Sequence, residues 1–252
     1  MIIDCQSTES TLASLAGICQ RSPAATFEAL QFADPTPTLE HPEVATAGPS
    51  AFLASLEVTQ LSIHGSMYFH GTRATSLDSF YSDGILPTAR ALEGIWTTLA
   101  ALAANHGNDR DRISELRQQL ESKSHVRGSW QFRHKVSNPR INGGPFGHLI
   151  RDQHRPSPGR HDYLAVPEIV QDIAQCIEID LERLFAESTK PYIVKFATQE
   201  QDPRIVEPIF WHLREELCNE VPSMNSYCAF SGNGFSIPPR DIVKIEDMSA
   251  GW

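Results

Sequence analysis

Short apolar segments typical of strands alternate with helical segments from residue 67 to the end of the chain, and this order constrains the fold most. Residues 67–70 are apolar and aromatic, as expected of a buried strand. Residues 75–83 are expected to form a helix, because Gly84 follows where glycine readily adopts the left-handed backbone that ends helices. The pattern indicates an α+β domain. Further strands are predicted at 94–98, 192–196, 226–230 and 241–245.

Four more segments carry helical patterns. Residues 99–105 are rich in alanine, and 109–123 are charged on most faces, as an exposed helix would be. In 167–184, proline fits the first helical turn, and isoleucine and leucine recur at three- and four-residue spacing. Residues 206–218 are predicted to form the last helix.

Residues 1–62 are expected to form an N-terminal extension, partly helical or flexible, ahead of a domain over 63–252. They hold two short apolar-periodic pieces, at 11–19 and 25–32. A stretch rich in proline, alanine, threonine and glycine follows, and this composition favours turns and extended chain. Within the domain, residues 124–162 contain many prolines and glycines and are expected to form a long basic loop or lid.

The charge of the chain is negative overall but unevenly distributed. The formal net charge of −10 argues against a protein that coats nucleic acid in bulk. Residues 123–161 nevertheless hold eight Lys or Arg, five His and a single acid, Asp152. Such a positive island suits a phosphate-bearing ligand, and a solvated flexible loop is the alternative.

The sequence predicts neither a membrane span nor a secreted disulfide framework. No apolar run approaches the ~20 residues that cross a bilayer, and Asp4 lies where a secretory signal carries basic residues. The five cysteines include no C-x-x-C pair, so reduced thiols in a cytoplasmic compartment are expected. That compartment would be the bacterial cytoplasm, or the host cytosol for an injected effector.

One segment resembles a known superfamily. Residues 68–74, with the sequence YFHGTRA, followed by a short helix and GILP at 84–87, are similar to the opening of ADP-ribosyltransferases of the His-first branch. The rifampin-modifying ADP-ribosyltransferases and, more distantly, the RNA 2′-phosphotransferases begin in a similar way. The resemblance implies an ADP-ribosyltransferase-like split mixed β-sheet with flanking helices, and NAD+ as co-substrate.

The same resemblance implies roles for individual residues. His70 would hydrogen-bond the NAD+ ribose, and its ring offers a donor and an acceptor. The backbone of Gly71 would hold the nicotinamide amide, because glycine lets a ligand approach closely. Thr72 would add a hydroxyl, and Arg73 is included among the predicted cofactor-binding residues.

The second element of the family places a tyrosine on the next strand, where it stacks on nicotinamide. This sequence has Trp96 in the segment IWTT at 95–98, with Thr97 beside it as a further cofactor-binding residue. Tryptophan offers a large π face to a cationic ring. The alternative role for Trp96 is filling of the core.

The third element of the family is a Glu or Asp that stabilises the cation formed as nicotinamide leaves. In one alignment, residues 192–199 and the acidic turn that follows them resemble the strand and acidic turn of the rifampin-modifying enzymes. This alignment indicates Asp202 or Glu200. Another places NSY at 225–227 where related polymerases carry Asn-Glu-Tyr, with Ser226 in place of the acid. Glu220 precedes that segment and is a further possibility, so the catalytic carboxylate remains open at this point.

Metal chemistry is not predicted. His148, His154 and His161 lack the spacing of a tight zinc site, and neighbouring arginines would repel a cation.

Three functional hypotheses follow. The first is a mono-ADP-ribosyltransferase, a glycosyltransferase that moves ADP-ribose from NAD+ to a protein or small-molecule acceptor, as a bacterial toxin or effector would. The second is an RNA 2′-phosphotransferase-like enzyme, to whose family 231–234 and 238–239 are distantly similar. The third is a catalytically inactive binding module on the same fold. The acceptor is not predicted, because the loop at 124–162 carries no signature.

Overall fold

The chain divides into two units in the computed structural model. The structure describes residues 1–32, 48–107, 110–122, 126–138, 143–157, 161–217, 219 and 223–252. Unit 1 comprises Met1–Phe69, His148–Gln153 and Ala197–Phe230. Unit 2 comprises His70–Gly147, His154–Phe196 and Ser231–Trp252. Residues 1–62, expected as an N-terminal extension, are therefore grouped with two later segments of the chain.

The strands form one hydrogen-bonded sheet with the order β5-β3-β2-β4-β6, and β1 pairs with β2 off this path. β1 and β2 are parallel, whereas β2–β3 and β4–β6 are antiparallel. Because the chain combines α-helices with a sheet that is largely antiparallel, the predicted α+β class is confirmed. The strands are β1 (Ile2–Ile3), β2 (Gly65–Ala74), β3 (Phe146–His148), β4 (Lys190–Thr198), β5 (Ala229–Ser231) and β6 (Ile242–Asp247).

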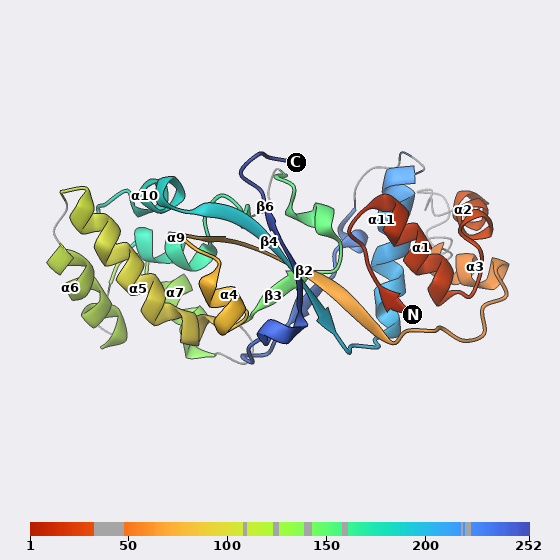
Figure 1. Cartoon of the computed structure of the whole chain (residues 1–252), viewed down its shortest axis with the longest axis horizontal. Coiled ribbons are helices and arrows are strands. Elements are labelled where there is room, and N and C mark those ends of the chain that lie inside the picture. The colour runs from red at the N-terminus through yellow and green to blue at the C-terminus, as the bar shows by residue number, and fades with distance from the viewer. Residues whose placement is uncertain are drawn as a thin grey trace. The chain divides into compact units, whose positions relative to one another are not determined.

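Unit 1 is built around a group of four helices that lie side by side (Figure 1). Ser7 caps the first helix with a capping box, which satisfies backbone N–H groups at its start. The rings of Phe52 and Phe210 pack at 5.3 Å between centroids in the core of this group. The helices are α1 (Thr8–Ile18), α2 (Pro23–Phe32), α3 (Gly48–Ser55) and α11 (Val206–Leu217).

Unit 2 holds the remaining helices and its own apolar core. The core gathers leucine, isoleucine and aromatic side chains from α5, α6, α7, α9 and α10. The helices are α4 (Asp78–Ser82), α5 (Thr88–Asn105), α6 (Arg110–Glu121), α7 (Trp130–Ser137), α9 (Glu168–Ala174) and α10 (Leu181–Ser188).

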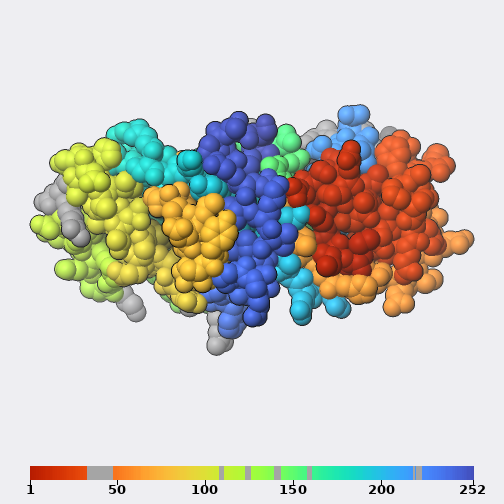
Figure 2. Space-filling model, viewed as in Figure 1, coloured from red at the N-terminus to blue at the C-terminus, as the bar shows by residue number. Residues whose placement is uncertain are grey.

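Short 3-10 helices complete the described elements. They are η2 (Arg151–His154), η3 (Pro203–Ile205), η4 (Met224–Ser226) and η5 (Pro239–Asp241). α4 contacts η5, and the space-filling view shows the orange-yellow α4 segment beside the blue C-terminal segment (Figure 2). Gly84, which follows α4, has φ of +78°, and a Cβ there would lie 1.9 Å from the Ile237 carbonyl oxygen. The predicted role of this glycine is confirmed.

The strand predicted at 94–98 is wrong, because these residues lie within α5. β-branched residues suggested a strand, but Thr97 and Thr98 direct their hydroxyls to the carbonyls of Glu93 and Gly94, one helical turn back. Trp96 then falls on the same helical face as the buried Leu99. Tertiary burial of that face has outweighed the local preference of the threonines.

Other predictions differ in their boundaries. The single helix expected over 167–184 is two helices, because α9 ends at Ala174 and Asp180 caps the start of α10. The loop expected over 124–162 contains α7, β3 and η2. The strand expected at 226–230 begins only at Ala229, since η4 occupies Met224–Ser226.

The remaining elements are confirmed in type. β2 covers 67–70, β4 covers 192–196, and β6 covers most of 241–245. α4, α6 and α11 match the helices predicted at 75–83, 109–123 and 206–218. In the described part of the chain, no helix is both long enough and apolar enough to span a bilayer.

Candidate functional site

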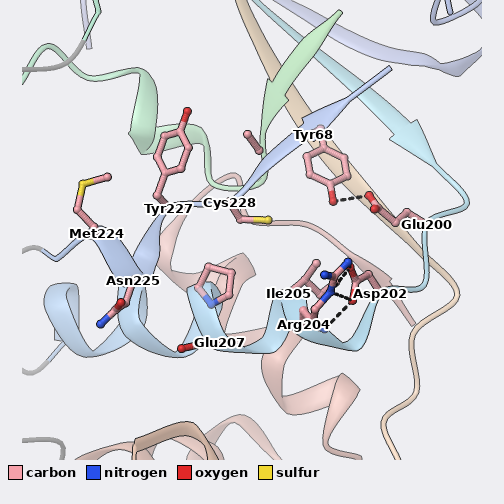
Figure 3. Close-up of a pocket in the computed structure, with 12 residues that line it drawn as sticks. Tyr68, Glu200, Asp202, Arg204, Ile205, Glu207, Met224, Asn225, Tyr227 and Cys228 are labelled. Carbon is pink, nitrogen blue, oxygen red and sulfur yellow. Dashed lines mark hydrogen bonds and ion pairs between the residues drawn. The ribbon is translucent and has the colours of Figure 1, made fainter. Parts of the chain in front are cut away.

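A pocket of about 520 Å³ lies in unit 1 (Figure 3). This volume is within the ~300–1,000 Å³ typical of small-molecule sites. Three segments that are distant in the sequence build it: β2, the chain from the end of β4 into α11, and the chain from η4 into β5. Its lining consists of Tyr68, Glu200, Asp202, Arg204, Ile205, Glu207, Pro208, Met224, Asn225, Tyr227, Cys228 and Ala229.

A buried tyrosine fixes one carboxylate of the pocket. The side chain of Tyr68 points from β2, is 1% exposed, and packs its ring against Phe230 at 5.2 Å. Its hydroxyl donates a hydrogen bond of 2.7 Å to Oε2 of Glu200 (Figure 3). Burial, together with the hydrogen bond and charge of Glu200, raises the pKa of Tyr68 well above its ordinary value. The phenol is therefore a permanent donor at neutral pH.

A second carboxylate is engaged in an ion pair. Asp202 caps η3 by accepting from the backbone N–H of Arg204 at 2.9 Å. The guanidinium of Arg204 donates to both carboxylate oxygens at distances from 2.6 to 3.0 Å. The hydrogen bonds from Arg204 lower the pKa of Asp202. Both oxygens of Asp202 are thus occupied within the chain, although the Arg204 side chain is 89% exposed.

The thiol in the pocket is a weak nucleophile. Cys228 is half-buried, and burial followed by the charges of Glu200 and Asp202 raises its pKa to about 11. At neutral pH the thiol is therefore protonated, and only the thiolate attacks efficiently.

The segment at 225–227 contributes two of its three residues to the pocket. Asn225 and Tyr227 are on the lining (Figure 3). Ser226 is not: it is buried, and its hydroxyl donates to the Ser223 carbonyl at 2.9 Å. The residue at the position where the resemblance implies an acid is therefore used inside its own turn.

The structure brings together two of the predicted site residues, Glu200 and Asp202. Glu200 and Asp202, from one alignment, share the pocket with Asn225 and Tyr227, from the other. Glu220 lies outside the described residues. The sequence analysis missed the remaining lining residues, of which Tyr68 could have been found, because it stands two positions before His70 on the same predicted strand.

His70 belongs to unit 2 and does not line this pocket. It is half-buried on β2, and its Nδ1 lies 2.7 Å from the Phe146 carbonyl oxygen. A carbonyl only accepts, so Nδ1 is the donor. Burial lowers the pKa of His70 below 6.5, although the bond to Phe146 opposes this. The neutral ring leaves Nε2 as an acceptor, which suits a ligand hydroxyl.

The neighbours of His70 on β2 are largely used by the protein itself. A Cβ on Gly71 would lie 2.6 Å from Nδ1 of His154 and 3.3 Å from Cβ of Tyr163. The close approach at this glycine is therefore made by side chains of the same unit. Thr72 is half-buried.

Arg73 has a structural role, which corrects its place among the predicted cofactor-binding residues. Its guanidinium donates to the Thr189 hydroxyl at 2.9 Å and to the carbonyls of Leu164, Ala186 and Thr189 at 2.6 Å each. Four of its five N–H groups are thus spent on holding unit 2 together.

Trp96 fills the core, so the alternative stated for it is the one observed. It is 2% exposed and packs against Phe132 at 6.0 Å between ring centroids. Its expected position on a strand was wrong, and stacking on nicotinamide has no support. Thr97 is exposed on α5 and donates to the carbonyl of Glu93 at 3.0 Å.

The histidines of the basic segment pack against tyrosines. His148 meets Tyr227 edge-on at 5.1 Å in unit 1, and in unit 2 the ring of Tyr163 contacts His161 at 4.6 Å and His154 at 6.4 Å. Over the described ranges, no group of three or more His, Cys, Asp or Glu could hold a metal ion.

Comparison of this chain with protein-family models, with curated proteins and with solved structures finds no match.

Proposed function

We propose that the chain is an NAD+-dependent mono-ADP-ribosyltransferase with an ADP-ribosyltransferase-like split sheet. One observation carries the proposal: a single pocket of unit 1 gathers Glu200, Asp202, Asn225 and Tyr227. One alignment of the resemblance nominates Glu200 or Asp202, whereas Asn225 and Tyr227 only flank Ser226 in the alternative alignment, more than twenty positions further along the sequence. Their convergence on one pocket is what a catalytic site would require.

The proposed reaction exchanges one bond at C1′ of the NAD+ ribose for another. The bond to nicotinamide breaks, its electron pair leaves with nicotinamide, and positive charge develops on the ribose. A nucleophile on a protein or small-molecule acceptor then bonds to C1′ and loses its proton. A fixed carboxylate stabilises the developing cation electrostatically, which is the main contribution that such a site can make.

Within unit 2, the state of the His70 ring agrees with the role that the resemblance implies for it. Its Nδ1 is held by Phe146, and its neutral ring presents Nε2 as an acceptor. An acceptor of fixed orientation can take a hydrogen bond from a ribose hydroxyl, as the resemblance implies. Fixing the ring in advance reduces the entropy lost when the sugar binds.

A binding module without catalysis is the second candidate. It is favoured by the use of Arg73 and Trp96 inside unit 2, since neither remains for the dinucleotide. In that case the pocket would bind a ligand without breaking a bond.

The test is the release of nicotinamide from NAD+, measured by chromatography, together with transfer of label from adenine-labelled NAD+ to proteins of a bacterial or host lysate. The proposal expects both signals. Absence of binding heat, release and transfer would reject the transferase and favour the binding module, whose ligand is then not NAD+. Heat of NAD+ binding without release or transfer would reject catalysis and leave NAD+ as a bound ligand.

A further inference from the structure

We infer that Tyr68 is a positioning residue that holds Glu200, and that Glu200 rather than Asp202 is the carboxylate that stabilises the ribosyl cation. This inference rests on the proposed function and decides what the sequence left open, namely which acid acts.

Glu200 is held at two points by neighbours on and beside β2. Its Oε2 accepts from the Tyr68 hydroxyl at 2.7 Å, and its backbone N–H donates to the Thr198 hydroxyl at 3.3 Å. That hydroxyl in turn donates to the Ser66 carbonyl on β2 at 3.2 Å. The glutamate is thus tied to β2 through its carboxylate and through its backbone.

β2 is shaped for this approach. A Cβ on Gly65 would lie 2.6 Å from the Thr198 carbonyl oxygen, so glycine is required for β2 to come this close. The Tyr68 ring is 1% exposed and packed on Phe230, which leaves its hydroxyl little freedom. A rigid donor on a strand fixes a flexible side chain more precisely than a solvent-exposed partner would.

The two acids differ in what occupies their oxygens. Arg204 takes both oxygens of Asp202 and supplies a full opposing charge. Tyr68 is neutral, because burial raises the pKa of its phenol, so it orients Glu200 without cancelling the negative charge. In the part of the chain that the structure describes, Oε1 of Glu200 accepts no hydrogen bond. Glu200 therefore has both the charge and the free oxygen that a developing cation needs.

The experiment measures nicotinamide release by the full-length chain and by the variants Glu200→Gln, Asp202→Asn and Tyr68→Phe. Glu200→Gln is expected to lose most of kcat. Tyr68→Phe is expected to lower kcat about 10- to 100-fold with little change in KM, because a carboxylate displaced by about 1 Å costs that much. Asp202→Asn is expected to stay within a few-fold of the parent. Tyr192→Phe, at a buried tyrosine of unit 2, is the matched control and should match the parent.

The decisive readout is the double variant Tyr68→Phe/Glu200→Gln. If Tyr68 acts only through Glu200, removing its hydroxyl from the Glu200→Gln variant changes kcat no further. If Tyr68 has a merely structural role, removing its hydroxyl lowers kcat by the same factor in the parent chain and in the Glu200→Gln variant. Should Tyr68→Phe fail to fold, Glu200→Asp replaces it. That change keeps the charge but withdraws the carboxylate from the phenol, and a similar loss is expected.

The outcomes separate this inference from the proposed function. No nicotinamide release by the parent chain, alone or with lysate, overturns both. An active parent overturns this inference alone if Tyr68→Phe or Glu200→Asp keeps the parent kcat. The inference is also overturned if the losses of kcat in Tyr68→Phe and in Glu200→Gln add in the double variant. It is overturned as well if Asp202→Asn loses more kcat than Glu200→Gln.

Discussion

Trp96 shows how one side chain can satisfy a sequence pattern and still serve another purpose. The segment at 95–98 has the composition of a strand, and a tryptophan there could meet a nicotinamide ring. In the structure Trp96 is 2% exposed among apolar side chains of α5, α7 and their neighbours. Its indole therefore contributes to stability and not to recognition.

Replacement of Trp96 by alanine is expected to lower the free energy of unfolding by about 3–5 kcal/mol, because a large buried ring leaves a cavity. The measurement is urea denaturation followed by circular dichroism. Trp130→Ala is the matched control, since Trp130 is 69% exposed on α7 and should change stability by at most about 0.5 kcal/mol. Equal stability of the two variants would show that Trp96 is not in the core.

At the scale of elements, α7 and α9 are joined by a charged cluster. Nζ of Lys135 on α7 lies 2.6 Å from Oδ2 of Asp172 and 2.9 Å from Oε2 of Glu168, both on α9. The Asp172 side chain is 4% exposed, and Lys135 lies beside it as a partner of opposite charge. Removing one member of a buried pair leaves the other charge uncompensated.

Lys135→Met is therefore expected to destabilise unit 2. Breaking a buried ion pair lowers the free energy of unfolding by several kcal/mol. We expect a small loss within this class, about 3 kcal/mol, because 23% of the Lys135 side chain is exposed. Adding Asp172→Asn should recover part of this loss, because the buried charge is then gone. Arg183→Met, in an exposed network with Asp180 and Glu187, should destabilise the chain much less, because solvent screens exposed ion pairs. Thermal unfolding of the parent and the variants measures these differences. If Lys135→Met is as stable as the Arg183→Met control, Lys135 does not form a stabilising ion pair between α7 and α9.

Prediction from the sequence succeeded where the signal was local. The strands at 192–196 and 241–245 and the helix at 206–218 are specified by their own apolar periodicity, and Gly84 by its backbone requirement. The break between α9 and α10 was missed because the isoleucine and leucine spacing continues through it. The position of Trp96 was missed because burial of one face of α5 outweighed β-branched composition.

At the scale of the whole molecule, the pocket is the feature that sequence reasoning reached only in part. Glu200 and Asp202 were found through a resemblance, but their meeting with Tyr68 and Cys228 depends on how unit 1 places the start of β2 and the segments 200–208 and 224–229. No short pattern encodes contacts between residues more than a hundred positions apart. The inference that separates the two acids rests on their hydrogen-bond partners, which the sequence alone does not show.

The stability of the molecule should fall as the pH drops below about 6.5. Burial is the largest cause that lowers the pKa values of His70 in unit 2 and of His212 in unit 1 below 6.5. In the unfolded chain both rings take up a proton near that pH, while in the folded chain they resist. The unfolded state then binds more protons, so the free energy of unfolding decreases with falling pH.

Each histidine can contribute at most about 1.4 kcal/mol per pH unit to this slope. This slope is measured by urea denaturation at intervals from about pH 7.5 to about pH 5.5. The window lies above the pH range in which most carboxylates titrate. His70→Gln and His212→Gln should each flatten the profile, and the double variant should flatten it further, because glutamine carries no titrating proton. A parent chain whose stability stays level or rises as the pH falls through this window would contradict the burial of both rings as neutral groups. A single variant that alone abolishes the slope would restrict the effect to one unit.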